Sequence, residues 1–75
     1  MAISDVKARW RIDYWLNWDI CQKCLRNDND MTATYIEARK RNEQIVEQFK
    51  RVFSMTAEQV ADYLEKGRPQ WAKNY

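Results

Sequence analysis

The sequence predicts an all-α protein: a three-helix bundle built on a long antiparallel helical hairpin, with a short third helix and an aromatic C-terminal tail. Two observations support this class. The 75 residues include one glycine and one proline, whereas folds rich in β-strands need turn residues at frequent intervals. Apolar residues also recur at steps of three and four, which is the period of an α-helix. We expect residues 1–75 to form a single helical domain.

The expected ends of the first two helices follow from a break in this pattern. A first helix over residues 4–26 ends before the run Asn-Asp-Asn-Asp at 27–30, because short polar side chains compete for backbone hydrogen bonds and favour turns. A second helix covers residues 31–53, and Asp30 or Thr32 is suited to cap its N-terminus.

A third, shorter helix is expected over residues 56–66. Thr56 and Gln59 have the spacing of a capping box, in which each side chain accepts a hydrogen bond from the backbone N–H of the other residue. Gly67 occupies the position of a C-cap glycine, and residues 67–75 form a short tail that is basic and aromatic.

Heptad seams on the first two helices predict how they pair. The second helix carries apolar residues and one asparagine at alternating steps of four and three: Met31, Tyr35, Ala38, Asn42, Ile45, Phe49 and Val52. The first helix carries a matching series: Trp10, Tyr14, Asn17, Cys21 and Cys24. In an antiparallel hairpin, pairing Asn17 with Asn42 places Trp10 near Phe49. We predict a direct contact between the two asparagine amides, because an unpaired buried amide costs about 1–3 kcal/mol.

The composition argues against several classes of function. The chain has no histidine, which removes the commonest general base and metal ligand, and it has no glycine-rich phosphate loop. Cys21 and Cys24 would need two further ligands to hold zinc, so we interpret them as small buried side chains with free thiols in a reducing cytoplasm. No apolar run is long enough for a transmembrane helix. We therefore expect no catalysis, no cofactor, no metal site and no membrane partner.

One short segment resembles a known class of domain. Met55-Thr-Ala-Glu-Gln-Val-Ala-Asp-Tyr-Leu64 is similar to the opening helix of helix-turn-helix domains of the excisionase and MerR type. The resemblance covers these residues alone and implies a DNA-recognition helix after a tight turn. Here Glu65-Lys-Gly-Arg-Pro69 follows and few residues remain, so a full recognition helix does not fit. We expect a structural helix at this position and do not carry DNA binding over.

A surplus of apolar side chains on the first helix predicts a docking surface for another protein. The helix carries more large apolar residues than a short third helix should cover: Ile12, Leu16 and Ile20 as a ridge, with Trp15 and Trp18 on its flank. Exposed patches rich in Trp and Ile mark protein interfaces. We assign partner binding to these residues, with Arg11 orienting the contact and Trp71 joining it from the tail. The expected function is a small non-catalytic regulator or inhibitor, of the kind that phages encode, acting as a monomer or a homodimer.

Three alternatives stay open. The tail could cover the ridge, with Arg11 stacked on Trp15 and Trp71 folded back onto the bundle. Interleaved basic and aromatic residues also occur in nucleic-acid binders, although the net charge of +2, from 13 basic and 11 acidic residues, is closer to neutral than such proteins usually are. Finally, the seam around Asn42 could hold a structural homodimer, since a lone asparagine fixes the register of coiled coils.

Overall fold

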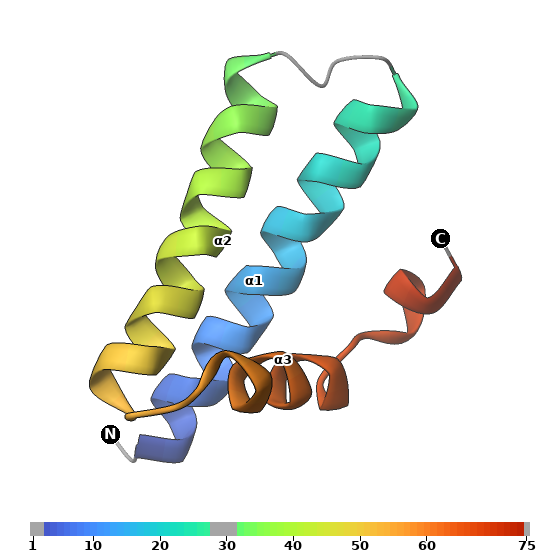
Figure 1. The fold of residues 1–75 in the computed structure, drawn as a ribbon. Coiled ribbons are helices and arrows are strands. Elements are labelled where there is room, and N and C mark those ends of the chain that lie inside the picture. The colour runs from blue at the N-terminus through green and yellow to red at the C-terminus, as the bar shows by residue number, and fades with distance from the viewer. Residues whose placement is uncertain (1–2, 28–31, 75) are drawn as a thin grey trace.

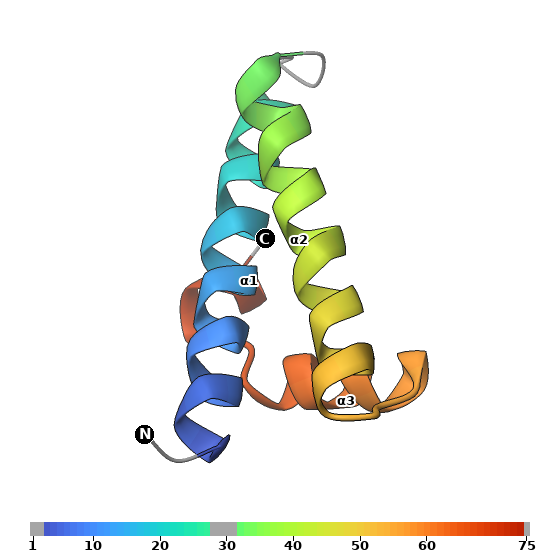
Figure 2. The ribbon, with the colours of Figure 1, turned by 90° about the vertical axis from the view of Figure 1, so that its left-hand side faces the viewer.

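The computed structural model describes residues 3–27 and 32–74. These residues form three α-helices and one short 3-10 helix: α1 (Ile3–Arg26), α2 (Ala33–Val52), α3 (Ala57–Lys66) and η1 (Gln70–Asn74). α1 and α2 run antiparallel as a hairpin, and α3 crosses the open end of that hairpin (Figure 1). Figure 2 shows the same hairpin from the side of α2, with η1 next to α1. The predicted all-α class, with a long helical hairpin and a short third helix, is confirmed.

Thr32 caps the second helix. Its side-chain oxygen accepts a hydrogen bond from the backbone N–H of Tyr35 at 3.3 Å, which satisfies one of the donors that the first turn of a helix leaves unpaired. α2 accordingly begins at Ala33, two residues after the predicted start. The alternative cap, Asp30, and the first predicted seam residue, Met31, lie outside the described residues.

α3 begins with the capping box that the sequence predicts. The Thr56 hydroxyl oxygen accepts a hydrogen bond from the Gln59 backbone N–H at 3.2 Å, and the Gln59 side-chain oxygen accepts one from the Thr56 backbone N–H at 2.9 Å. Just before this cap, Ser54 has a φ of 53°, in the left-handed region that residues other than glycine seldom adopt. This turn leads the chain from α2 into α3, across the end of the hairpin (Figure 1).

Replacing Thr56 with alanine is expected to lower the free energy of unfolding by about 1 kcal/mol, because the hydroxyl oxygen that accepts from the Gln59 backbone N–H is lost. Chemical denaturation followed by circular dichroism measures this change. Thr34→Ala is the matched control, since Thr34 is an exposed residue in the first turn of α2. It should change the free energy of unfolding by less than about 0.5 kcal/mol. Equal effects of the two substitutions would contradict the capping role of Thr56.

The core lies where α3 crosses the open end of the hairpin. Phe49 is fully buried, and its ring packs edge-on against the ring of Trp10, with centroids 5.3 Å apart. Val60 of α3, 1% exposed, closes the same cluster. Nearer the turn, the contact between α1 and α2 is filled by smaller buried side chains, Cys21 and Ala38. The predicted pairing of Trp10 with Phe49 is confirmed.

The predicted contact between Asn17 and Asn42 is wrong. The Asn42 amide nitrogen donates a hydrogen bond to the backbone carbonyl of Tyr14 at 3.2 Å, and its buried Oδ1 has no hydrogen-bond partner. Asn17 is also buried, but it lines a different groove, together with Arg41 and Gln44. The two amides therefore lie on opposite sides of the contact between α1 and α2. Heptad spacing fixes the position of a residue along a helix more tightly than its direction around the helix axis.

Candidate functional site

Trp15, one of the residues predicted to bind a partner, is a core residue. Its side chain is 4% exposed, and its indole Nε1 donates a hydrogen bond to the backbone carbonyl of Leu64 at 2.9 Å. Because Leu64 lies near the C-terminal end of α3, this bond ties the first helix to the third. α3 and the tail cover Trp15, so its side chain is not available on the surface.

Arg68 joins the tail to the first helix. Its guanidinium lies over the rings of Trp15 and Trp18, at 5.1 and 5.4 Å from their centroids. Its Nη2 donates a hydrogen bond to the backbone carbonyl of Ala72 at 3.3 Å, and Ala72 is fully buried. The basic and aromatic composition of the tail indicates that it can pack against tryptophan. The sequence alone does not identify Arg68 as the residue that does so, because its contacts depend on the path of the chain after α3.

Arg11 stacks on Tyr63 of α3, and not on Trp15 as one alternative interpretation had it. Its guanidinium carbon lies 4.5 Å from the centre of the Tyr63 ring, and the Lys7 ammonium lies 4.8 Å from the same ring. Gly67 is the C-cap residue of α3, but its φ of −101° lies outside the left-handed region. A Cβ at Gly67 would overlap the end of the Arg11 side chain. A larger residue at this position would therefore require the end of the Arg11 side chain to shift.

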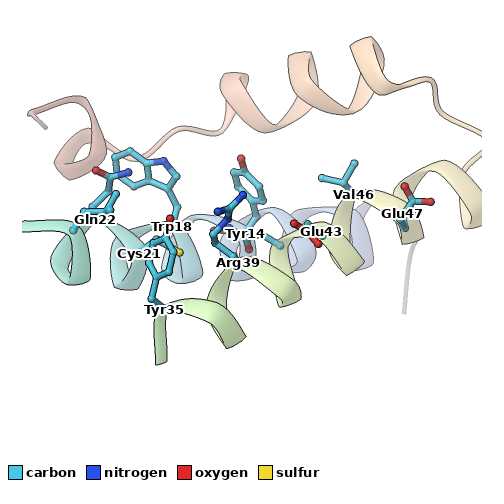
Figure 3. A pocket seen from close by; sticks show the side chains of 11 residues that line it. Tyr14, Trp18, Cys21, Gln22, Tyr35, Arg39, Glu43, Val46 and Glu47 are labelled. Carbon is cyan, nitrogen blue, oxygen red and sulfur yellow. The ribbon is translucent and has the colours of Figure 1, made fainter. Parts of the chain in front are cut away.

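The half of the hairpin nearer the turn carries an open groove of about 640 Å³ between α1 and α2 (Figure 3). Its apolar lining comes from both helices: Trp18 and Leu25 of α1, and Tyr35 and Val46 of α2. Arg39 and Glu43, both exposed, add charges of opposite sign. The groove thus combines aromatic and aliphatic surface with a mixed-charge border.

Trp71 extends this apolar surface at one end. Its ring centroid lies 6.5 Å from that of Trp18, and its side chain remains 42% exposed. The tail therefore folds back onto the bundle while leaving Trp71 partly open to solvent. Two of the residues predicted to bind a partner, Trp18 and Trp71, are brought together here.

Two ionisable groups of the groove have raised pKa values. Burial raises the pKa of the Cys21 thiol, and neighbouring Cys24 raises it further, against the opposing charge of Arg39. Burial also raises the pKa of the Tyr14 phenol, with a smaller contribution from the charge of Glu65. A protonated thiol is a weak nucleophile. The raised pKa of the Cys21 thiol therefore makes it less reactive than an ordinary exposed cysteine.

Ile12 and Leu16 lie apart from the groove, on another face of the first helix. They are 59% and 53% exposed, and Ile20, the third residue of the predicted ridge, is partly buried. The tail covers Trp15 and leaves this pair uncovered. The residues predicted to form one docking surface are thus divided between the core, the Tyr63 stack, the groove and this outer face.

Within residues 3–27 and 32–74, no cluster of three or more cysteine or carboxylate side chains could hold a metal ion. Among these residues, no helix combines the length and apolar character that crossing a bilayer requires. α3 is followed by the 3-10 helix η1, so the described residues contain no recognition helix of the helix-turn-helix type after it. Comparisons with protein families, with curated proteins and with solved structures give no match to this chain.

Proposed function

We propose that this protein is a small, non-catalytic protein-binding regulator that docks an amphipathic helix of another protein in the groove between α1 and α2. The observation that carries the proposal is the incomplete coverage of the hairpin. α3 packs across the open end and η1 lies at the level of Trp18, so among the described residues the half nearer the turn has two α-helices and no third (Figure 1). Helices bury apolar stripes by packing into grooves between neighbouring helices. A partner helix would complete the bundle.

The groove lining has the chemistry of a helix-binding site. Trp18 and Tyr35 are of the residue types that contribute most to binding energy at protein interfaces. Leu25 is 45% exposed, so a partner would remove a large apolar side chain from water. Arg39 and Glu43 can orient a helix whose polar flank carries both charges. Helices in such grooves anchor themselves through apolar residues three and four positions apart.

The positions of the cations favour a protein over a nucleic acid as the partner. Lys7, Arg11 and Arg68 each lie over an aromatic ring of the chain itself. The two components of a single-strand binding site, stacking rings and cations, are therefore engaged with each other. Cys21 and Cys24 are free thiols, which suits the reducing cytoplasm in which we place this protein.

Leu25→Glu is expected to weaken the binding of amphipathic helical peptides at least about tenfold, because it puts a charge into the apolar groove. The peptides would be selected from a display library on the purified protein, and their dissociation constants measured by isothermal titration calorimetry. Raising the salt from about 50 to about 500 mM should change those constants by less than about threefold, since apolar contacts dominate.

Val52→Glu is the matched control, because Val52 is 60% exposed and lies outside the groove. It should leave peptide binding unchanged. The proposal fails if no helical peptide is enriched over a scrambled library, or if both variants weaken binding equally. It also fails if the protein instead binds a single-stranded oligonucleotide with a steep dependence on salt.

A further inference from the structure

The first helix carries a second surface, which the groove does not use. Residues on its outer face recur at alternating steps of four and three, and we call them the outer stripe: Asp5, Arg9, Ile12, Leu16, Asp19 and Lys23. All but Asp19 are exposed, and the Asp19 carboxylate pairs with the Lys23 ammonium at 3.0 Å. This spacing keeps the residues on one face of the helix over about five turns. The outer stripe therefore has the spacing of a coiled-coil seam on a largely exposed face, and its central Leu16 also borders a groove shared with α2.

The residues of the outer stripe are spaced symmetrically about its midpoint, and the charges on the two sides of that midpoint are opposite in sign. Two apolar residues occupy the centre, and each charge on one side has an opposite charge at the same distance on the other. The mirrored pairs, from the centre outward, are Ile12 with Leu16, Arg9 with Asp19, and Asp5 with Lys23. A surface with this symmetry is complementary to itself after a half-turn.

We propose that the outer stripe binds a second copy of this chain, in an antiparallel dimer with two-fold symmetry. A two-fold axis perpendicular to the first helix, through the centre of the stripe, brings each residue beside its mirror partner on the other copy. Ile12 then packs on Leu16 of the partner subunit, and Arg9 faces Asp19 of the partner subunit. Asp5 faces Lys23 of the partner subunit in the same way. Each contact occurs twice, so two apolar layers are enclosed by four ion pairs.

The charges select the antiparallel orientation. In a parallel pair each charged residue of the stripe would meet its own copy, which gives like-charge contacts at four levels. The antiparallel pair replaces all of them with opposite-charge contacts and also sets the two helix dipoles in favourable opposition. Asp13 is an exposed residue beside the centre of the stripe, and in the antiparallel pair it is the one carboxylate of the stripe region that comes near its own copy. Arg41 borders the same groove as Asp13, so a positive charge lies on the same side of the helix as this carboxylate.

This dimer differs from a dimer held through Asn42. Asn42 is engaged within the chain, where its amide donates to the Tyr14 carbonyl. The outer stripe and the groove also lie on different faces of the first helix. The dimer would therefore present two grooves, and a partner with two helices could bind both at once.

Charge reversal with rescue tests the proposed register. Arg9→Glu and Asp19→Arg are each expected to weaken the dimer about tenfold, and the double variant is expected to restore it. Arg9 and Asp19 are separated by about 15 Å along the helix axis, so they cannot compensate for each other within one chain. Sedimentation equilibrium at low salt, with protein from about 10 μM to about 1 mM, measures the dissociation constant.

Two further variants separate the stripe from the rest of the surface. Leu16→Glu places a charge at the apolar centre and is expected to give a monomer, whereas Val52→Glu, on an exposed site of α2, should leave the dimer intact. Circular dichroism and peptide binding to the groove should be unchanged in every stripe variant. This last readout keeps the result independent of the test of the groove.

A chain that stays monomeric up to about 1 mM overturns the proposal, and so does a dimer that both single charge reversals leave unchanged. Weakening by each single reversal without recovery in the double variant refutes the antiparallel register. Recovery in the double variant, together with a monomeric Leu16→Glu protein, supports it.

Discussion

The Trp15→Ala variant is expected to lose about 3–5 kcal/mol of unfolding free energy, which is a large part of the stability of a domain of this size. The substitution removes a side chain that is 4% exposed, its 2.9 Å hydrogen bond to the Leu64 carbonyl and one of the rings that Arg68 covers. All of these contacts lie where α1, α3 and the tail meet. Urea denaturation followed by circular dichroism should show a much lower midpoint, or a chain that is unfolded without denaturant.

Two variants calibrate this result. Trp71→Ala removes a tryptophan that is 42% exposed and should cost less than about 1 kcal/mol. Trp15→Phe keeps a ring but loses the indole donor, and should cost about 1–2 kcal/mol, since the Leu64 carbonyl retains its hydrogen bond from the Gly67 N–H. If Trp15→Ala costs no more than Trp71→Ala, Trp15 does not belong to the core.

Asn42→Leu is expected to raise the free energy of unfolding by about 1–2 kcal/mol. The buried Oδ1 of Asn42 has no hydrogen-bond partner, so the folded state carries the cost of removing that oxygen from water. The lost hydrogen bond leaves no new unpaired group, because Tyr14 lies inside α1 and its carbonyl keeps its intrahelical partner. The leucine adds apolar contact between the two helices of the hairpin. The denaturation midpoint should rise with an unchanged slope.

The control for this gain is Asn42→Ala, which removes the amide without filling its space. The cavity left behind should offset the relief of the unpaired oxygen, so stability should stay within about 1 kcal/mol of the parent protein. A loss of stability in Asn42→Leu as large as that of a core cavity would show that the asparagine amide is fully satisfied. Peptide binding to the groove should also change in Asn42→Leu, because Asn42 borders that groove.

Local signals in the sequence account for the helices and their pairing. The capping box at Thr56 involves hydrogen bonds between residues three positions apart, so it can be read directly from the residue types. The heptad spacing of the two seams determines which residues meet along the hairpin, and the contact of Trp10 with Phe49 follows from it. Both features depend on near neighbours or on a regular period.

The division of the tryptophans between core and surface depends on contacts that a regular period does not contain. Helical spacing puts Trp15 and Trp18 on one flank of the first helix, and the positions of α3 and of the chain after it decide which of them is buried. The role of Arg68 has the same origin, because its contacts join segments far apart in the sequence. For Asn17 and Asn42, a fraction of a helical turn is enough to send the two amides to opposite sides of the seam.

The tail is held by weaker interactions than the hairpin core. Its anchors are the stacking of Arg68 on two rings, each contact contributing about 0.5–1 kcal/mol, hydrogen bonds of 3.3 and 3.4 Å, the contact of Trp71 with Trp18, and the buried Ala72. Segments with few and weak contacts open locally, at a lower free energy than global unfolding. Such an opening leaves the packing around Phe49 intact while uncovering the ring faces of Trp15 and Trp18 on which Arg68 lies. Because Trp71 extends the apolar surface of the groove, an opening of the tail would change the extent of aromatic surface that a partner meets.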